Sequence, residues 1–145
     1  MGVRPRTQLA ADAGIECGRG IKTDRYLRTS VENVYAIGDC AEVEGHVLVY
    51  VAPLMAAARA LAATLTDTPA EVAYPAMPVT IKTPACPGCV SPVASDAEGE
   101  WTIEADGQNV KALFHSPEGD LVGFALTGQA VKERMPLTKQ LPASL

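Results

Sequence analysis

Two apolar stretches in the first half of the chain predict its main elements. Four consecutive apolar residues at 34–37 precede a Gly-Asp pair, a pattern typical of a short strand that is covered on both faces. We therefore expect a strand at 33–37. Alanine dominates 52–65, which predicts a helix, and Pro53 fits its first turn because a missing N–H costs nothing there.

Shorter patterns surround these two elements. A helix is expected over 8–13, ended by Gly14, and short strands are expected at 20–23 and 26–28. Residues 40–47 are predicted to form a loop.

The second half of the chain has the alternating apolar and polar residues and the turn sequences that are typical of a β-rich domain. Proline-interrupted residues 66–75 indicate a linker, and we expect strands at the following ranges: 78–82, 101–105, 110–115 and 121–126. The last three are predicted to form an antiparallel meander, with Ser116–Asp120 as a turn. A short helix over 128–135, stopped by Pro136, and a loosely ordered tail over 137–145 complete the expected organisation.

Composition narrows the possible classes of function. The chain has 145 residues and a formal net charge of -5, without a basic stripe, which argues against nucleic acid as a partner. The longest apolar stretch, 47–65, is interrupted by Pro53 and Arg59, so it does not predict a membrane span. With no apolar core after the first arginines to indicate a signal peptide, a cytoplasmic location is expected.

The Gly-Asp pair and the helix start carry the candidate chemistry of the first half. Gly38 allows close approach of the backbone to a ligand, and the Asp39 carboxylate can accept a hydrogen bond from a sugar-like hydroxyl. The start of the alanine-rich helix offers free N–H groups and a positive dipole end, which stabilise negative charge. Its candidate binding residues are Val51, Ala52 and Pro53.

The stretch from Thr29 to Asp39 resembles the flavin-binding motif T-x-x-x-x-[VI]-[YF]-A-x-G-D of flavoprotein reductases with two dinucleotide-binding domains. This resemblance implies that Asp39 binds the ribityl-phosphate part of FAD and that the helix start faces the flavin pyrimidine ring. The segment Gly2–Pro5 is similar to the G-x-x-P segment that follows the nicotinamide-binding domain of this family. Because no G-x-G-x-x-G occurs, we expect the chain to be the carboxy-terminal part of a longer reductase.

The second half resembles the small carboxy-terminal domain of NADH-dependent rubredoxin reductases. The matching features are Tyr74, the stretch 78–84 with its Lys-Thr-Pro, and the Leu-x-Gly-Phe-x-Leu-x-Gly strand at 121–128. The resemblance implies that Lys82 lies beside the flavin, that NADH is the electron donor and that rubredoxin is the partner. Related ferredoxin reductases of oxygenase systems, and a non-catalytic docking module, remain alternatives.

These features together predict an α/β fold class. Residues 1–65 are expected to be the carboxy-terminal portion of a Rossmann-like FAD-binding domain and 66–77 a linker. Residues 78–145 are expected to be a small α+β domain with an antiparallel sheet.

Two further features of the second half leave alternatives open. Cys86 and Cys89 have C-x-x-C spacing, but the prolines around them predict a loop or edge segment rather than a redox helix, and no second ligand pair for zinc is present. Four basic residues either form a face that steers an acidic partner or belong to a mixed-charge surface. They are Lys111, Lys132, Arg134 and Lys139.

Overall fold

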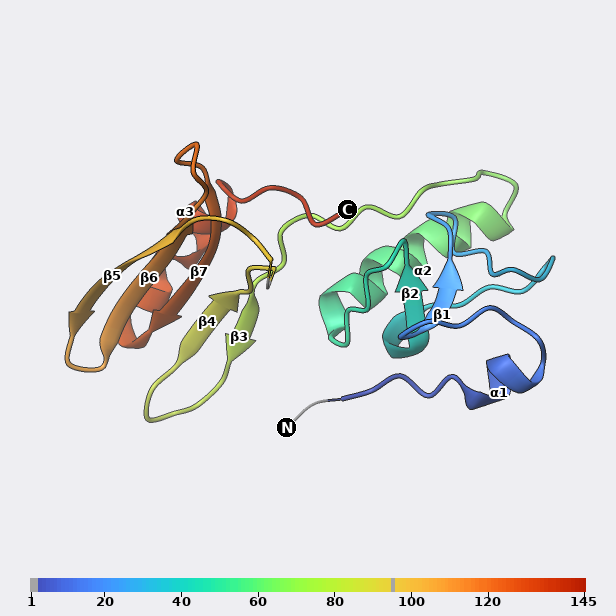
Figure 1. Cartoon of the computed structure of the whole chain (residues 1–145), viewed down its shortest axis with the longest axis horizontal. Helices are drawn as coiled ribbons and strands as arrows, with labels where there is room; N and C mark the ends of the chain where they lie inside the picture. Colours follow the sequence, from blue (N-terminus) through green and yellow to red (C-terminus); the bar gives the residue numbers. More distant parts are fainter. Residues whose placement is uncertain (1–2, 95) are drawn as a thin grey trace. The chain divides into compact units, whose positions relative to one another are not determined.

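The computed structural model describes residues 3–94 and 96–145. The chain divides into two compact units: one reaches to Tyr74 and includes Leu145, and the other spans Pro75–Ser144 (Figure 1). The predicted α/β class with a small antiparallel domain is confirmed. None of the helices in the described ranges is long and apolar enough to cross a membrane.

The first unit joins a two-stranded parallel sheet to one long helix. Its strands are β1 (Ile21–Thr23) and β2 (Ala41–Val43), paired from Ile21–Ala41 to Thr23–Val43. The helices are α1 (Gln8–Asp12), the single 3-10 turn η1 (Gly38–Cys40) and α2 (Val51–Leu65). Leu27, Val43, Ala57 and Val72 are among the most deeply buried side chains of this unit.

Two predicted strands of this unit are wrong. The segments 26–28 and 33–37 are joined only by an isolated bridge between Arg28 and Tyr35. Leu27 and Asn33 have positive φ angles of 66° and 62°, and such left-handed residues interrupt a ladder. Conversely, β2 occupies part of the predicted loop at 40–47, because pairing with β1 holds this short segment extended.

The second unit is a five-stranded antiparallel sheet with the order β3-β4-β7-β6-β5 (Figure 1). Strands β5, β6 and β7 form the predicted meander, whereas β4 was not predicted. The strands are β3 (Val79–Ile81), β4 (Gly88–Ser91), β5 (Glu100–Asp106), β6 (Asn109–His115) and β7 (Leu121–Thr127).

One face of this sheet carries the core of the second unit. The 3-10 helix η2 (Gly128–Glu133) and helix α3 (Arg134–Thr138) contribute Val131 and Leu137 to a cluster with the sheet. The sheet contributes Cys89, Leu121, Phe124 and Leu126 to the same cluster. Pro136 does not stop a helix as predicted, because α3 begins anew at Arg134 and Pro136 falls within its first turn.

The tail is also more ordered than its sequence predicts. Leu137 is 7% exposed, and Leu141 packs against the core cluster. Leu145 exchanges two backbone hydrogen bonds with Tyr74 of the first unit, with N···O distances of 3.0 and 3.1 Å. Strand-like pairing of its last residue therefore fixes the end of the chain.

Candidate functional site

The Gly-Asp pair of the motif forms a tight turn against the start of α2. Gly38 begins η1 with a φ of +77°, a left-handed conformation that favours glycine. A Cβ added at Gly38 would lie 3.3 Å from Leu54 Cδ1, in the first turn of α2. The turn and the helix start therefore approach each other closely, and glycine is the residue that permits it.

The start of α2 keeps its backbone donors free of side-chain caps. Tyr50 is the N-cap residue in an extended conformation, and it makes no side-chain capping hydrogen bond. Val51 is 72% exposed and Ala52 is also exposed, while Pro53 is buried and has no N–H to satisfy. An exposed helix start with uncapped N–H groups and no acidic residue in its first turn can stabilise a negatively charged group.

A narrow cavity lies between the turn and the helix start. Gly38, Pro53 and Leu54 line it, so the structure brings two of the predicted binding residues together. Tyr74 also lines it and is 4% exposed. Sequence reasoning recognised Tyr74 only as part of a motif, because nothing local to residue 74 indicates that it lines the same cavity as residue 38.

The tyrosines near this cavity are partly removed from water. Burial raises the pKa of the Tyr50 hydroxyl. Burial also raises the pKa of Tyr74, and the neighbouring Tyr50 adds to that effect. Both hydroxyls therefore favour their neutral form at this end of α2.

The two charged site residues of the sequence prediction lie in different units. Asp39 is exposed at the middle of η1, rather than at the end of a strand as predicted. Lys82 is exposed and follows β3 directly, so it lies just beyond the strand that was expected to include it. Whether Lys82 shares a ligand with Asp39 stays a prediction.

The cysteine pair of the second unit lies at a strand start. Cys89 is 1% exposed within β4 and belongs to the core cluster. Cys86 precedes the strand, and both are free thiols. Within the ranges that the structure describes, no group of three or more potential ligands is placed to hold a metal ion. The arrangement is that of one packing cysteine and one loop cysteine.

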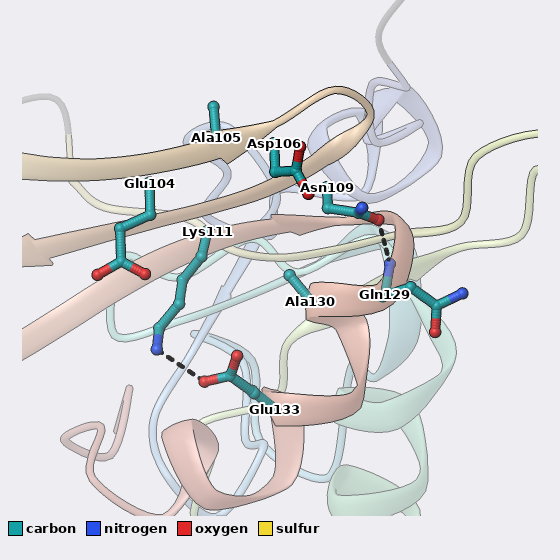
Figure 2. Close-up of a pocket in the computed structure, with 8 residues that line it drawn as sticks. All are labelled: Glu104, Ala105, Asp106, Asn109, Lys111, Gln129, Ala130 and Glu133. Atoms are coloured by element: carbon teal, nitrogen blue, oxygen red, sulfur yellow. Dashed lines mark hydrogen bonds and ion pairs between the residues drawn. The ribbon is translucent and has the colours of Figure 1, made fainter.

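One of the four basic residues of the second unit forms an ion pair. Lys111 forms an ion pair with Glu133 at 2.7 Å, beside a groove of about 370 Å³ (Figure 2). The groove is also lined by Glu104 and Asp106, so its charge is net acidic. The other three are exposed: Lys132 lies in η2, Arg134 begins α3, and Lys139 follows α3.

Known families match both units. Residues 1–63 match the model of the pyridine nucleotide-disulphide oxidoreductases, and residues 71–141 match that of the rubredoxin binding C-terminal domain. A Rubredoxin-NAD(+) reductase of Alcanivorax borkumensis is 62% identical over 143 residues, which are 99% of this chain and 37% of that protein. A Rubredoxin-NAD(+) reductase of Acinetobacter baylyi is 48% identical, over 98% of this chain and 36% of that protein.

A solved structure shares the fold. The NADH:rubredoxin oxidoreductase from Clostridium acetobutylicum matches with a TM-score of 0.80 at 19% identity, over 97% of this chain and 37% of that one. The chain thus spans little more than a third of the length of the curated relatives that it matches. By both family models, the chain belongs to the pyridine nucleotide-disulphide oxidoreductases of the rubredoxin reductase type, which carry a rubredoxin binding C-terminal domain.

Proposed function

We propose that this chain supplies part of the FAD site and the acceptor-binding domain of a reductase that passes electrons from NADH through FAD to rubredoxin. The observation that carries the proposal is the close approach of the Gly38–Asp39 turn to the uncapped start of α2. The exposed Asp39 carboxylate can bind ligand hydroxyls, and the free N–H groups at the start of α2 can bind negative charge. Because Gly38 has no Cβ, the turn leaves room for such a ligand.

Each residue has a distinct role in this proposal. Asp39 accepts a hydrogen bond from a ribityl hydroxyl, and Gly38 keeps the turn free of a side chain. The N–H groups of Val51 and Ala52 stabilise negative charge on the pyrimidine ring, while Pro53 fixes the first turn of α2. FAD, when bound, would supply the two-electron and one-electron redox chemistry that connects NADH to the acceptor.

The second unit is proposed to carry the acceptor side of the reaction. Its match to the rubredoxin binding C-terminal domain family supports rubredoxin as the acceptor. Lys82 is proposed to lie beside the flavin and to stabilise its reduced form through its positive charge. We assign residues 1–65 to the FAD-binding portion, 66–77 to the linker and 78–145 to the acceptor domain; the division of the chain after Tyr74 falls within this linker.

The first experiment measures FAD retention by this chain. The purified chain is mixed with FAD, desalted, and examined for a bound flavin spectrum. Asp39→Asn is expected to weaken FAD binding about tenfold, because a hydrogen bond to a charged group contributes roughly 1.5–3 kcal/mol. Asp67→Asn is the matched control, since Asp67 is an exposed aspartate of the same unit beyond the end of α2.

A chimera tests the proposal in a complete protein. This chain replaces the matching residues of the Alcanivorax borkumensis relative, to which it is 62% identical. We expect the chimera to retain flavin and to reduce rubredoxin with NADH, and Asp39→Asn in the chimera to lower flavin retention. A folded chimera that binds no flavin, or equal retention in the Asp39 and Asp67 variants, contradicts the proposed site.

A further inference from the structure

Strand β5 is an edge strand that is exposed along its whole length. All seven residues of Glu100–Asp106 are exposed, including Trp101 at 46% and Ile103 at 63%. One edge of β5 pairs with β6 over its full length, from Glu100–His115 to Asp106–Asn109. In the part of the chain that the structure describes, no strand pairs with the other edge.

The opposite edge of the same sheet is protected by short length, proline and lysine, and β5 has none of these three. Strand β3 has only three residues, and Pro78, Lys82 and Pro84 flank it. Short length, proline and lysine are the usual means by which proteins block pairing at an edge. Strand β5 has seven residues, contains no proline or lysine, and pairs with β6 without a bulge.

The two faces of β5 differ in character. Because side chains alternate, Trp101, Ile103 and Ala105 lie on one face, where Trp101 packs edge-on against Phe114 with ring centroids 5.2 Å apart. Glu100, Thr102, Glu104 and Asp106 lie on the other. Figure 2 shows Ala105 pointing away from the groove, and Glu104 and Asp106 at its border.

These charges disfavour a second copy of the chain at this edge. In an antiparallel pairing centred on Ile103, Glu100 of one copy would face Asp106 of the other at both ends. Like charges directly opposite each other destabilise a strand pair. The same charges favour an incoming strand that has lysine or arginine on one face and apolar residues on the other.

We propose that the free edge of β5 docks an extended protein segment with alternating basic and apolar residues. The segment adds a sixth strand to the sheet, antiparallel to β5. Its apolar side chains cover Trp101 and Ile103, and a basic side chain enters the groove between Glu104 and Asp106. This site shares no residue with the proposed flavin site, so the two proposals can fail independently.

The backbone groups available for this pairing follow from the β5–β6 hairpin. A two-residue turn joins Asp106 to Asn109, which makes them the closing hydrogen-bonded pair. Hydrogen-bonded and non-hydrogen-bonded pairs alternate in an antiparallel ladder. The N–H and C=O groups of Trp101, Ile103 and Ala105 therefore point to the free edge.

Trp101 makes the test specific, because it is the single tryptophan of the chain. The intact chain is titrated at low salt with a seven-residue peptide of alternating lysine and valine. We expect a blue shift of the tryptophan emission and weaker quenching by acrylamide. Two matched peptides serve as controls: one has glutamate in place of lysine, and one is N-methylated at its valines, whose N–H groups would face β5. Neither is expected to shift the emission.

Charge reversal on the protein locates the binding. The double variant Glu104→Lys with Asp106→Lys is expected to bind the lysine–valine peptide about tenfold more weakly. The control double variant Glu32→Lys with Asp67→Lys has the same net charge, and its changes lie in the first unit, so it should bind within about twofold of the unchanged chain.

Four results would overturn the proposal. They are the absence of any emission shift, equal binding of the N-methylated peptide, equal weakening in both double variants, and a concentration-dependent dimer that shifts the emission without peptide. The last would assign the edge to a second copy of the chain.

Discussion

Replacing Gly38 by alanine tests the turn on which the proposed flavin site depends. Its φ of +77° places an alanine in the left-handed region, at a cost of about 1–2 kcal/mol. The new Cβ would also lie 3.3 Å from Leu54 Cδ1, so that side chain must move. Crowding of this kind adds about 1 kcal/mol, at the low end of the range for overpacked sites. We therefore expect Gly38→Ala to destabilise the first unit by about 2–3 kcal/mol.

Gly14 provides a control with nearly the same backbone conformation. Its φ is +78°, and an added Cβ would have no heavy atom within 4 Å. Gly14→Ala should therefore cost only the backbone contribution of about 1–2 kcal/mol. The difference between the two variants isolates the contact with the start of α2.

Urea unfolding can separate the units because their chromophores differ. All four tyrosines lie in the first unit, and the single tryptophan lies in the second. Gly38→Ala should lower the midpoint reported by tyrosine more than Gly14→Ala does, while the midpoint reported by Trp101 stays unchanged. It should also retain less FAD. Equal tyrosine midpoints and equal FAD retention in the two variants would refute the reasoning about this turn.

Three further perturbations test other parts of the structure. Burial raises the folded-state pKa of Tyr74 above its ordinary 10.0, so the stability that this group contributes is complete below pH 10.0 and is lost as pH rises through the folded-state pKa. Tyr74→Phe should flatten the fall of the first unit's urea midpoint at alkaline pH, and an unchanged fall would contradict the assignment. Gly123→Ala should destabilise the second unit by about 1–3 kcal/mol, because Val93 Cγ2 and the Ser91 carbonyl oxygen of β4 fill the space above it. Gly88→Ala should change the stability little, since its added Cβ has only ordinary contacts, and the Trp101 signal measures both variants. Lys111→Gln should lower the free energy of unfolding of the second unit by less than about 1 kcal/mol, because its partner Glu133 is half exposed. A larger loss of stability that persists in high salt would contradict this expectation.

The Gly38–Asp39 motif could be identified from the sequence although the local structure around it was predicted wrongly. The apolar residues at 34–37 indicated a central strand, but a central strand needs neighbours on both sides, and only an isolated bridge from Arg28 to Tyr35 is present. Asn33 adopts a left-handed backbone conformation, which the pattern of apolar residues does not predict. The motif itself depends on Gly38 and Asp39, and their identities are visible without the strand.

Strand β4 was missed for a different reason. Pro84, Pro87 and Pro92 indicated a loop or edge segment, and the strand has only four residues. It is held by pairing on both sides, with Cys89 opposite Thr80 of β3 and opposite Leu126 of β7. Such tertiary pairing overrides local propensity, so the sequence of β4 alone could not reveal it. The meander was predictable because its strands are longer and joined by recognisable turns.

Strand β2 explains how the two halves of the candidate site are held together. The Gly38–Asp39 turn and the start of α2 were both predicted to bind flavin, but the residues between them were predicted to be a loop. A free loop would let the turn and the helix move apart. Instead, β2 follows η1 directly and pairs in parallel with β1, and its Val43 is 2% exposed. Only Glu44–Tyr50 then remains to connect this anchored strand to the helix. The short parallel ladder therefore anchors the residues that link the Gly38–Asp39 turn to the start of α2, and substitutions that break the ladder should weaken ligand binding without touching a binding residue.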